Sequence, residues 1–120
     1  VAVASAAHDA AMAAHPVFAM TFARLYPLYV QKVERKGRTR AELDAVLGWL
    51  TGLDAAGLQR AVDRGIDLAT FLGEARFHPN ASRITGVVCG VRVEAVEDAA
   101  MQKLRWMDKL VDELAKGKAV

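Results

Sequence analysis

The chain has 120 residues, of which 53% are hydrophobic and 25% are charged, a composition typical of one compact domain and not of a disordered protein. Its 16 basic and 14 acidic residues leave a net charge of +2, which is too small to indicate nucleic-acid binding by itself. Its one cysteine, Cys89, excludes an internal disulfide framework and suits a reducing compartment. No apolar run reaches the roughly 18 residues that a membrane-spanning helix needs. The sequence therefore predicts a cytoplasmic protein without membrane contact.

An alanine-rich stretch opens the chain. Residues 2–14 consist mostly of alanine, the strongest helix former. His15-Pro16 follows, and the residue before a proline is pushed out of the α-helical region. We therefore expect a helical N-terminal arm over residues 1–15, weakly anchored because it lacks large side chains, and a single globular helical domain over residues 16–120.

Five later positions have the pattern of a helix start, in which a threonine or aspartate precedes apolar residues spaced three and four apart. They are Thr21, Thr39, Asp54, Asp67 and Asp98. The start at Thr39 is the clearest, because Thr39 and Glu42 have the spacing of a capping box. Glycines at positions 37, 52, 65 and 73 mark the expected ends of the first four helices. Pro27 complicates the first helix, which either kinks or begins there.

Residues 84–95 fit two structures. Their apolar positions have helical spacing, but the β-branched residues of 86–93 also suit a buried strand. We favour a helix, because a lone strand would find no partner in the chain and would leave backbone groups unpaired. A final helix follows, and its apolar seam consists of Ala100, Leu104, Met107, Val111 and Leu114.

The expected fold is all-α, a compact bundle of five to seven short helices. The alternative is an α+β fold with a short strand at about 86–93. Aromatic residues at helical spacing usually fill cores. We therefore expect core positions, in preference to a ligand pocket, for Tyr26, Tyr29, Trp49 and Trp106.

Signals for metal and nucleophile chemistry are weak. His8, Met12 and His15 could share one helical face as soft metal ligands, but we favour exposed histidines that bind no metal. Cys89 has apolar neighbours that would disfavour its thiolate, which indicates a structural thiol. The sequence contains no zinc-ligand spacing, phosphate-binding loop or nucleophile motif. We predict no metal and no cofactor, and we favour a role other than catalysis, although the sequence leaves enzymatic activity undecided.

Arg92, Glu94 and Asn80 are the polar candidates for a ligand site. Arg92 and Glu94 alternate with valines, so a bend in this segment could present Arg92 to an anion. A structural ion pair is the simpler interpretation, because charges near a core are normally paired. Asn80 lies in the irregular loop 76–82. A small-molecule site or an enzyme built around these residues is one alternative function.

The densest basic cluster suggests nucleic-acid binding as another alternative. It comprises Lys32, Arg35, Lys36, Arg38 and Arg40. Tyr26 and Tyr29 precede it, and cations for phosphates together with aromatic rings for base stacking are what a nucleic-acid surface needs. Glu34 interrupts the cluster, however, and a basic helix end is common in proteins that bind no nucleic acid. We do not favour this alternative.

Several segments resemble one bacterial family. They are Tyr26-Pro27-Leu28-Tyr29-Val30-Gln31-Lys32, Lys36-Gly37-Arg38-Thr39, Trp49-Leu50-Thr51-Gly52, Ile84-Thr85-Gly86-Val87-Val88-Cys89-Gly90-Val91-Arg92-Val93-Glu94 and residues 108–118. Through them the chain is similar, from about Met20 to Lys118, to domain-of-unknown-function family twenty-two hundred. The resemblance implies a soluble bacterial protein but no activity, cofactor or catalytic residue. The chain departs from the family pattern at Leu53, where tyrosine is common, and after Asp98, where a proline is expected.

The sequence as a whole favours a small binding or protein-interaction module, whose target is an unknown protein partner or a second copy of the chain. Nucleic acid bound through residues 32–40 and a small molecule bound near Arg92 and Glu94 are the alternatives. A pocket with converging polar groups near Arg92 would favour the small molecule. A flat basic face around Arg35 would favour nucleic acid, and an exposed apolar stripe would favour a protein partner.

Overall fold

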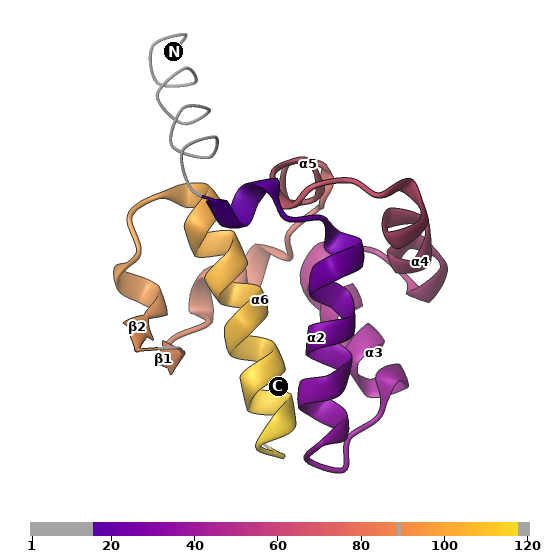
Figure 1. Ribbon diagram of the computed structural model, residues 1–120. Helices are drawn as coiled ribbons and strands as arrows, with labels where there is room; N and C mark the ends of the chain where they lie inside the picture. Colours follow the sequence, from indigo (N-terminus) through magenta and orange to yellow (C-terminus); the bar gives the residue numbers. More distant parts are fainter. Residues whose placement is uncertain (1–15, 89, 118–120) are drawn as a thin grey trace, which may run out of the picture.

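The computed structural model describes residues 16–88 and 90–117 (Figure 1). The predicted arm over 1–15, its three candidate metal ligands and the thiol of Cys89 lie outside the described residues. The elements in chain order are η1 (Pro16–Ala19), α2 (Phe22–Glu34), α3 (Arg40–Thr51), α4 (Ala55–Arg64), α5 (Leu68–Glu74), η2 (Pro79–Arg83), β1 (Val87–Val88), β2 (Val91–Arg92), η3 (Val93–Ala95) and α6 (Ala99–Ala115). The sequence predicted a mostly helical fold, and the structure confirms it.

All five predicted helix starts are confirmed. Each cap side chain accepts a hydrogen bond from the backbone N–H three residues later. The Glu42 N–H donates to Thr39 Oγ1 at 3.1 Å, and the Met101 N–H donates to Asp98 Oδ2 at 2.8 Å. Glu42 in turn accepts from the Thr39 N–H, which completes the capping box. Caps of this kind stabilise a helix by about 1 kcal/mol each, so the boundaries follow from local chemistry.

Pro27 lies inside α2, which neither begins nor breaks at this residue. A proline inside a helix removes one hydrogen bond and presses on the carbonyl four residues earlier. Pro27 and Leu28 face solvent, where water can replace the lost partner, whereas Phe22, Tyr26 and Tyr29 on the opposite side are buried. The predicted apolar face of α2 therefore forms in spite of the proline.

The helix that we favoured over 84–95 does not form. Val87 pairs with Arg92 and Val88 with Val91 in a two-stranded antiparallel hairpin, which is the strand alternative. Our objection to a strand was the lack of a partner, but this segment folds back and pairs with itself. Gly86, with φ 108°, and Gly90, with φ 75°, adopt backbone conformations that favour glycine.

Helix α6 is central to the fold. It packs against α2, α3, α5, the strand β1 and η3, and Figure 1 shows it running down the middle of the molecule. Its predicted apolar seam is buried along its whole length: Ala100, Leu104, Met107, Val111 and Leu114. The core continues into α2 and α5, where the rings of Phe22 and Phe71 stack with centroids 4.1 Å apart. Among the described residues no helix is long and apolar enough to cross a membrane.

Candidate functional site

Only two of the three polar candidates from the sequence, Arg92 and Glu94, contact each other in the structure. Arg92 Nη1 lies 3.1 Å from Glu94 Oε1, and Glu94 Oε2 accepts a hydrogen bond from the Gly86 N–H at 2.9 Å. Backbone N–H groups, its own and that of Gly86, together with Arg92 lower the pKa of Glu94. Asn80 instead donates its backbone N–H to His78 Nδ1 at 3.0 Å. Within the described residues, no hydrogen bond or ion pair connects Asn80 to the other two.

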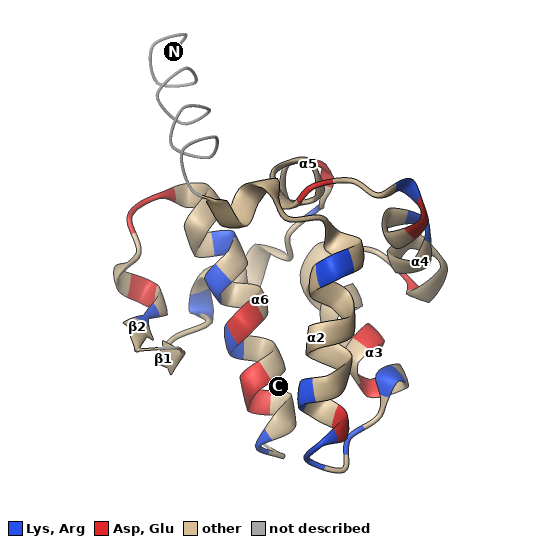
Figure 2. Ribbon diagram, in the orientation of Figure 1, with Lys and Arg blue, Asp and Glu red and all other residues tan. Residues whose placement is uncertain are grey.

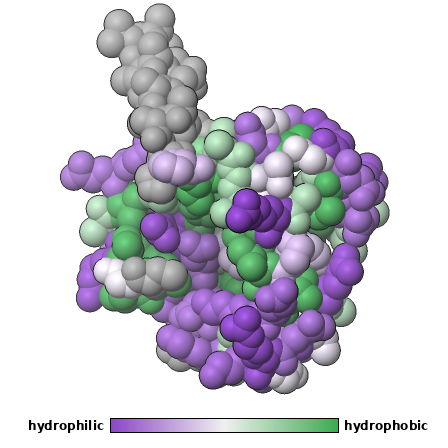
Figure 3. Space-filling view, in the orientation of Figure 1, coloured by the Kyte–Doolittle hydropathy of each residue, from purple (hydrophilic) through white to green (hydrophobic). Residues whose placement is uncertain are grey.

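The basic cluster lies at one end of the molecule, where α2 turns into α3 (Figure 2). Three of its cations have partners: Lys32 pairs with Asp112 at 3.3 Å, Arg38 with Glu42 at 2.5 Å, and Arg40 donates to Tyr26 Oη at 2.9 Å. Arg35 and Lys36 form no side-chain hydrogen bond or ion pair with the described residues. Hydrophilic side chains cover this end in the space-filling view (Figure 3).

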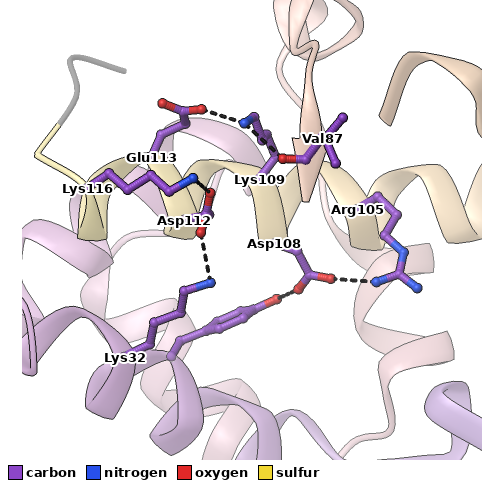
Figure 4. Close-up of polar contacts among 9 residues, drawn as sticks. Lys32, Val87, Arg105, Asp108, Lys109, Asp112, Glu113 and Lys116 are labelled. Carbon is purple, nitrogen blue, oxygen red and sulfur yellow. Dashed lines mark hydrogen bonds and ion pairs between the residues drawn. The ribbon is translucent and has the colours of Figure 1, made fainter. Parts of the chain in front are cut away.

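A ladder of polar contacts, which the sequence analysis did not identify, surrounds the C-terminal half of α6 (Figure 4). Asp108 accepts hydrogen bonds from Tyr29 of α2 and from Arg105, and Asp112 contacts Lys32 of α2 at 3.3 Å. Lys109 projects to the other side, where it meets Glu113 and the carbonyl of Val87. The sequence signal was the spacing of acidic and basic residues by three and four along α6.

Asp112 makes this ladder sensitive to acid. Burial, the largest single influence on the pKa of Asp112, raises it, but the hydrogen bonds and charges of Lys116 and Lys32 outweigh burial and hold the pKa below its usual 3.8. A carboxyl with a depressed pKa in the folded state stabilises the protein above its unfolded pKa. That stability is lost as the pH falls through the lower, folded pKa.

We therefore expect Asp112→Asn to be less stable than the wild type at neutral pH and to lose less stability below about pH 4. Urea unfolding at a series of pH values measures both effects. Glu97→Gln is the control, because the side chain of Glu97 is exposed and forms no hydrogen bond or ion pair with the described residues. Equal pH slopes for Asp112→Asn and the wild type would contradict the prediction.

An aromatic surface, formed by Trp49, Phe77, His78 and Trp106, lies where the loop after α5 crosses α3 and α6. The ring of Trp49 stacks on His78 with centroids 4.2 Å apart and 16° between planes. The ring centroids of Phe77 and Trp106 lie 6.0 Å apart. Two backbone hydrogen bonds hold the loop in place, since Arg76 and His78 donate their N–H groups to carbonyls at the end of α3.

Trp49 departs from the core position that the sequence predicted. Its side chain is 45% exposed, whereas Tyr26 and Tyr29 are buried as expected. Beside Trp49 an apolar groove of about 180 Å³ opens between α3 and α6, lined by Ala45, Val46, Trp49 and Leu110. Ala45 is small, which leaves this space open. Periodicity could not predict the exposure, because Trp49 lies three residues after the buried Val46, a spacing that normally places two side chains on one face of a helix.

Two cations lie near Phe77, one in space and one in sequence. Lys103 Nζ lies 5.3 Å from the ring centroid of Phe77, and Arg76 directly precedes that ring in the chain. Neither side chain forms an ion pair with a carboxylate of the described residues. Among the described residues, no group of three His, Cys, Asp or Glu side chains has the geometry of a metal site. Lys103 therefore lies beside the ring of Phe77, and Arg76 is an exposed neighbour of that residue in the chain.

The fold and these contacts define a small α-helical protein that has, within the described residues, one short hairpin and an exposed tryptophan beside half-buried aromatic rings. The chain belongs to the bacterial family described as "Uncharacterized protein conserved in bacteria (DUF2200)", whose model matches residues 16–120. This confirms the resemblance noted from the sequence. The solved crystal structure of an uncharacterized protein, SP1917, is similar, with a TM-score of 0.82 and 40% identity over 86% of this chain and 85% of that one. A comparison with curated proteins finds no match.

Neither the family nor the similar structure has an assigned activity. Family membership therefore transfers the fold but no chemistry to this chain. The geometry of the aromatic surface, the basic end and the pockets is what can indicate a function.

Proposed function

We propose that the protein is an interaction module that binds an apolar segment of a partner protein in the groove beside Trp49. The proposal rests on one observation: a tryptophan that remains 45% exposed while it forms one wall of an apolar groove. Isolated apolar residues on a surface are common. A large aromatic ring that borders a groove is typical of the residues that dominate protein interfaces.

Trp49 is ordered before a partner arrives. The stack on His78 fixes the plane of the indole, and two backbone hydrogen bonds fix the loop that carries His78 and Phe77. Ordering a side chain during binding costs about 0.5–1.5 kcal/mol. A ring already held in place avoids most of this cost, which supports a role in binding.

The size and charge of the surface indicate the partner's chemistry. A volume of about 180 Å³ lies below the roughly 300–1,000 Å³ of typical small-molecule pockets and suits one large aliphatic side chain. The groove is lined by apolar side chains, so it offers little to orient a polar metabolite. Arg76 and Lys103 favour acidic residues next to the anchor, because charges across an interface are usually complementary. We therefore favour a protein segment with an aliphatic anchor and flanking Asp or Glu.

A selection experiment tests this proposal. Random peptides displayed on phage are selected in parallel on the wild-type protein and on Trp49→Ala. We expect the wild type to enrich peptides with an aliphatic residue beside acidic residues. We expect synthetic versions of these peptides to bind Trp49→Ala at least tenfold more weakly, a difference of about 1.4 kcal/mol. Leu28→Ala is the control, because Leu28 is 51% exposed but lies on α2, outside the groove.

Two results would contradict the proposal: enrichment of the same peptides on both proteins, or enrichment without an apolar anchor. Arg76→Ala and Lys103→Ala should weaken the binding of the selected peptides and make this binding less sensitive to salt. Light scattering with the protein alone separates a peptide partner from self-association, since a dimer lost in Trp49→Ala would identify a second copy as the occupant.

The nucleic-acid alternative over residues 32–40 now depends on Arg35 and Lys36, because these two cations have no partner among the described residues. Binding of short DNA or RNA that weakens with salt and disappears in Arg35→Ala/Lys36→Ala, but not in Trp49→Ala, would favour it. The alternative site at Arg92, Glu94 and Asn80 predicts ligand binding that Arg92→Ala removes without unfolding the protein.

A further inference from the structure

A pocket between α4 and α5 lies outside the aromatic surface and has a different chemistry. Its volume is about 260 Å³. Its apolar lining comes from Leu53, Ala61, Ile66 and Phe71, and its charged lining from Arg60, Arg64 and Glu74. The pocket thus combines a hydrophobic interior with ionic groups, a combination that the groove beside Trp49 lacks.

The three charged groups of the pocket are not equivalent. Arg64 and Glu74, whose side chains are both about half exposed, form a two-point ion pair with Nη1 to Oε1 at 3.0 Å and Nη2 to Oε2 at 3.3 Å. This pair links α4 to α5 and neutralises itself. Arg60 lies one turn before Arg64 on α4, and its exposed side chain makes no hydrogen bond or ion pair with the described residues. The pocket therefore has one uncompensated positive charge.

We infer that this pocket binds a small carboxylate with an apolar body, which pairs its carboxylate with Arg60. A guanidinium presents parallel N–H donors that match the two oxygens of a carboxylate. A monoanion also matches the single uncompensated charge. Leu53, Ile66 and Phe71 provide the surface for the apolar body.

The pocket volume limits the size of the ligand. At roughly 30 Å³ per water molecule, 260 Å³ accommodates on the order of nine water-sized groups. A short branched or aromatic acid of this size fits, whereas a long-chain fatty acid does not. Such a carboxylate exists both as a free acid and as the C-terminal residue of a peptide, so the test includes one probe of each kind.

The test measures binding of 4-methylpentanoate, for the free acid, and N-acetyl-leucine, for a peptide C-terminus. Two-dimensional NMR titration reports affinity and location together. We expect saturable shifts in the amides of α4 and α5, binding at least tenfold weaker for 4-methylpentanamide, and little binding of inorganic phosphate. Tighter binding of 4-methylpentanoate indicates that the natural ligand is a free acid, and tighter binding of N-acetyl-leucine indicates a peptide C-terminus.

Arg60→Gln should weaken binding of the acid at least tenfold, and Arg60→Lys should restore part of the lost affinity. Arg24→Gln is the matched control, because it removes the same charge from an exposed position outside the pocket. Equal binding of acid and amide, or equal loss in Arg24→Gln and Arg60→Gln, would overturn the inference. So would shifts confined to residues outside the pocket. Trp49→Ala should leave acid binding unchanged, so failure here and failure of the proposed function are distinguishable.

Discussion

Phe22→Ala is expected to lower the free energy of unfolding by about 3–5 kcal/mol, the usual cost of removing a buried phenylalanine side chain. Phe22 is fully buried. Its ring centroid lies 4.1 Å from that of Phe71, on which it stacks, and 5.6 Å from that of Tyr26. Domains of this size are typically stable by only about 5–15 kcal/mol. The variant should therefore unfold at a much lower urea concentration, and a large part of it could be unfolded without urea.

The position of Phe22 explains why the loss of unfolding free energy should be among the largest for truncation of a core side chain in this molecule. Its backbone N–H donates to Ile66 at 2.9 Å, and Thr21 forms an isolated bridge with Asp67. Phe22 thus joins the start of α2 to the segment that leads into α5, so the cavity falls where separate parts of the chain meet.

Urea unfolding followed by circular dichroism measures the effect. Leu28→Ala on the same helix is the control, because Leu28 is 51% exposed and its truncation should change stability by no more than about 0.5 kcal/mol. Similar losses for the two variants would contradict the packing described here. A change in the slope of the urea dependence would indicate that the unfolding is no longer two-state.

Lys109→Ala is expected to cost about 2–4 kcal/mol, because it removes the cation from a nearly buried ion pair. The side chains of Lys109 and Glu113 are only 10% and 17% exposed, and Nζ lies 2.6 Å from Glu113 Oε1. Nζ also donates to the Val87 carbonyl at 3.2 Å, which attaches the hairpin to α6. Loss of the lysine removes its cation from the largely buried Glu113 carboxylate and its hydrogen bond from the hairpin.

The local environment of Lys109 makes the effect specific. A Cβ at Gly86 would lie 2.9 Å from Lys109 Cε, so the lysine stem packs directly on the glycine at the base of the hairpin. Gly86 also accepts the Val93 N–H at 2.8 Å. In Lys109→Ala, hydrogen exchange at the Val93 amide should accelerate more than exchange at the amides of α4.

Two further variants separate charge from packing. Lys109→Met keeps an apolar stem but still leaves Glu113 without this cation, and adding Glu113→Gln removes the remaining charge. We expect the double variant to be more stable than Lys109→Met alone, because replacing both members of a buried pair often costs little. If the two are equally stable, the pair does not contribute as proposed. Lys103→Ala is the control for loss of a lysine on α6 outside this contact.

Much of the candidate chemistry could not be read from sequence because it depends on contacts between distant residues. The spacing on α6 shows that Asp112 and Lys116 can pair, but only the packing of α2 brings Lys32 to the same carboxylate. The pairing of Arg64 with Glu74 depends on the angle between α4 and α5, and that angle decides which arginine of the pocket is left uncompensated.

The sequence by itself determined the features that arise from neighbours along the chain. The five cap residues, the capping box at Thr39 and the apolar seam of α6 were predicted correctly, because capping and helical periodicity act over three or four residues. The family resemblance was also visible in the sequence and is confirmed. Only the tertiary structure decided that Val87–Val88 and Val91–Arg92 pair as strands, that α2 continues through Pro27 and that Trp49 remains exposed. The reason is physical: partner strands, solvent access and burial are set by packing between elements, and local propensity does not encode them.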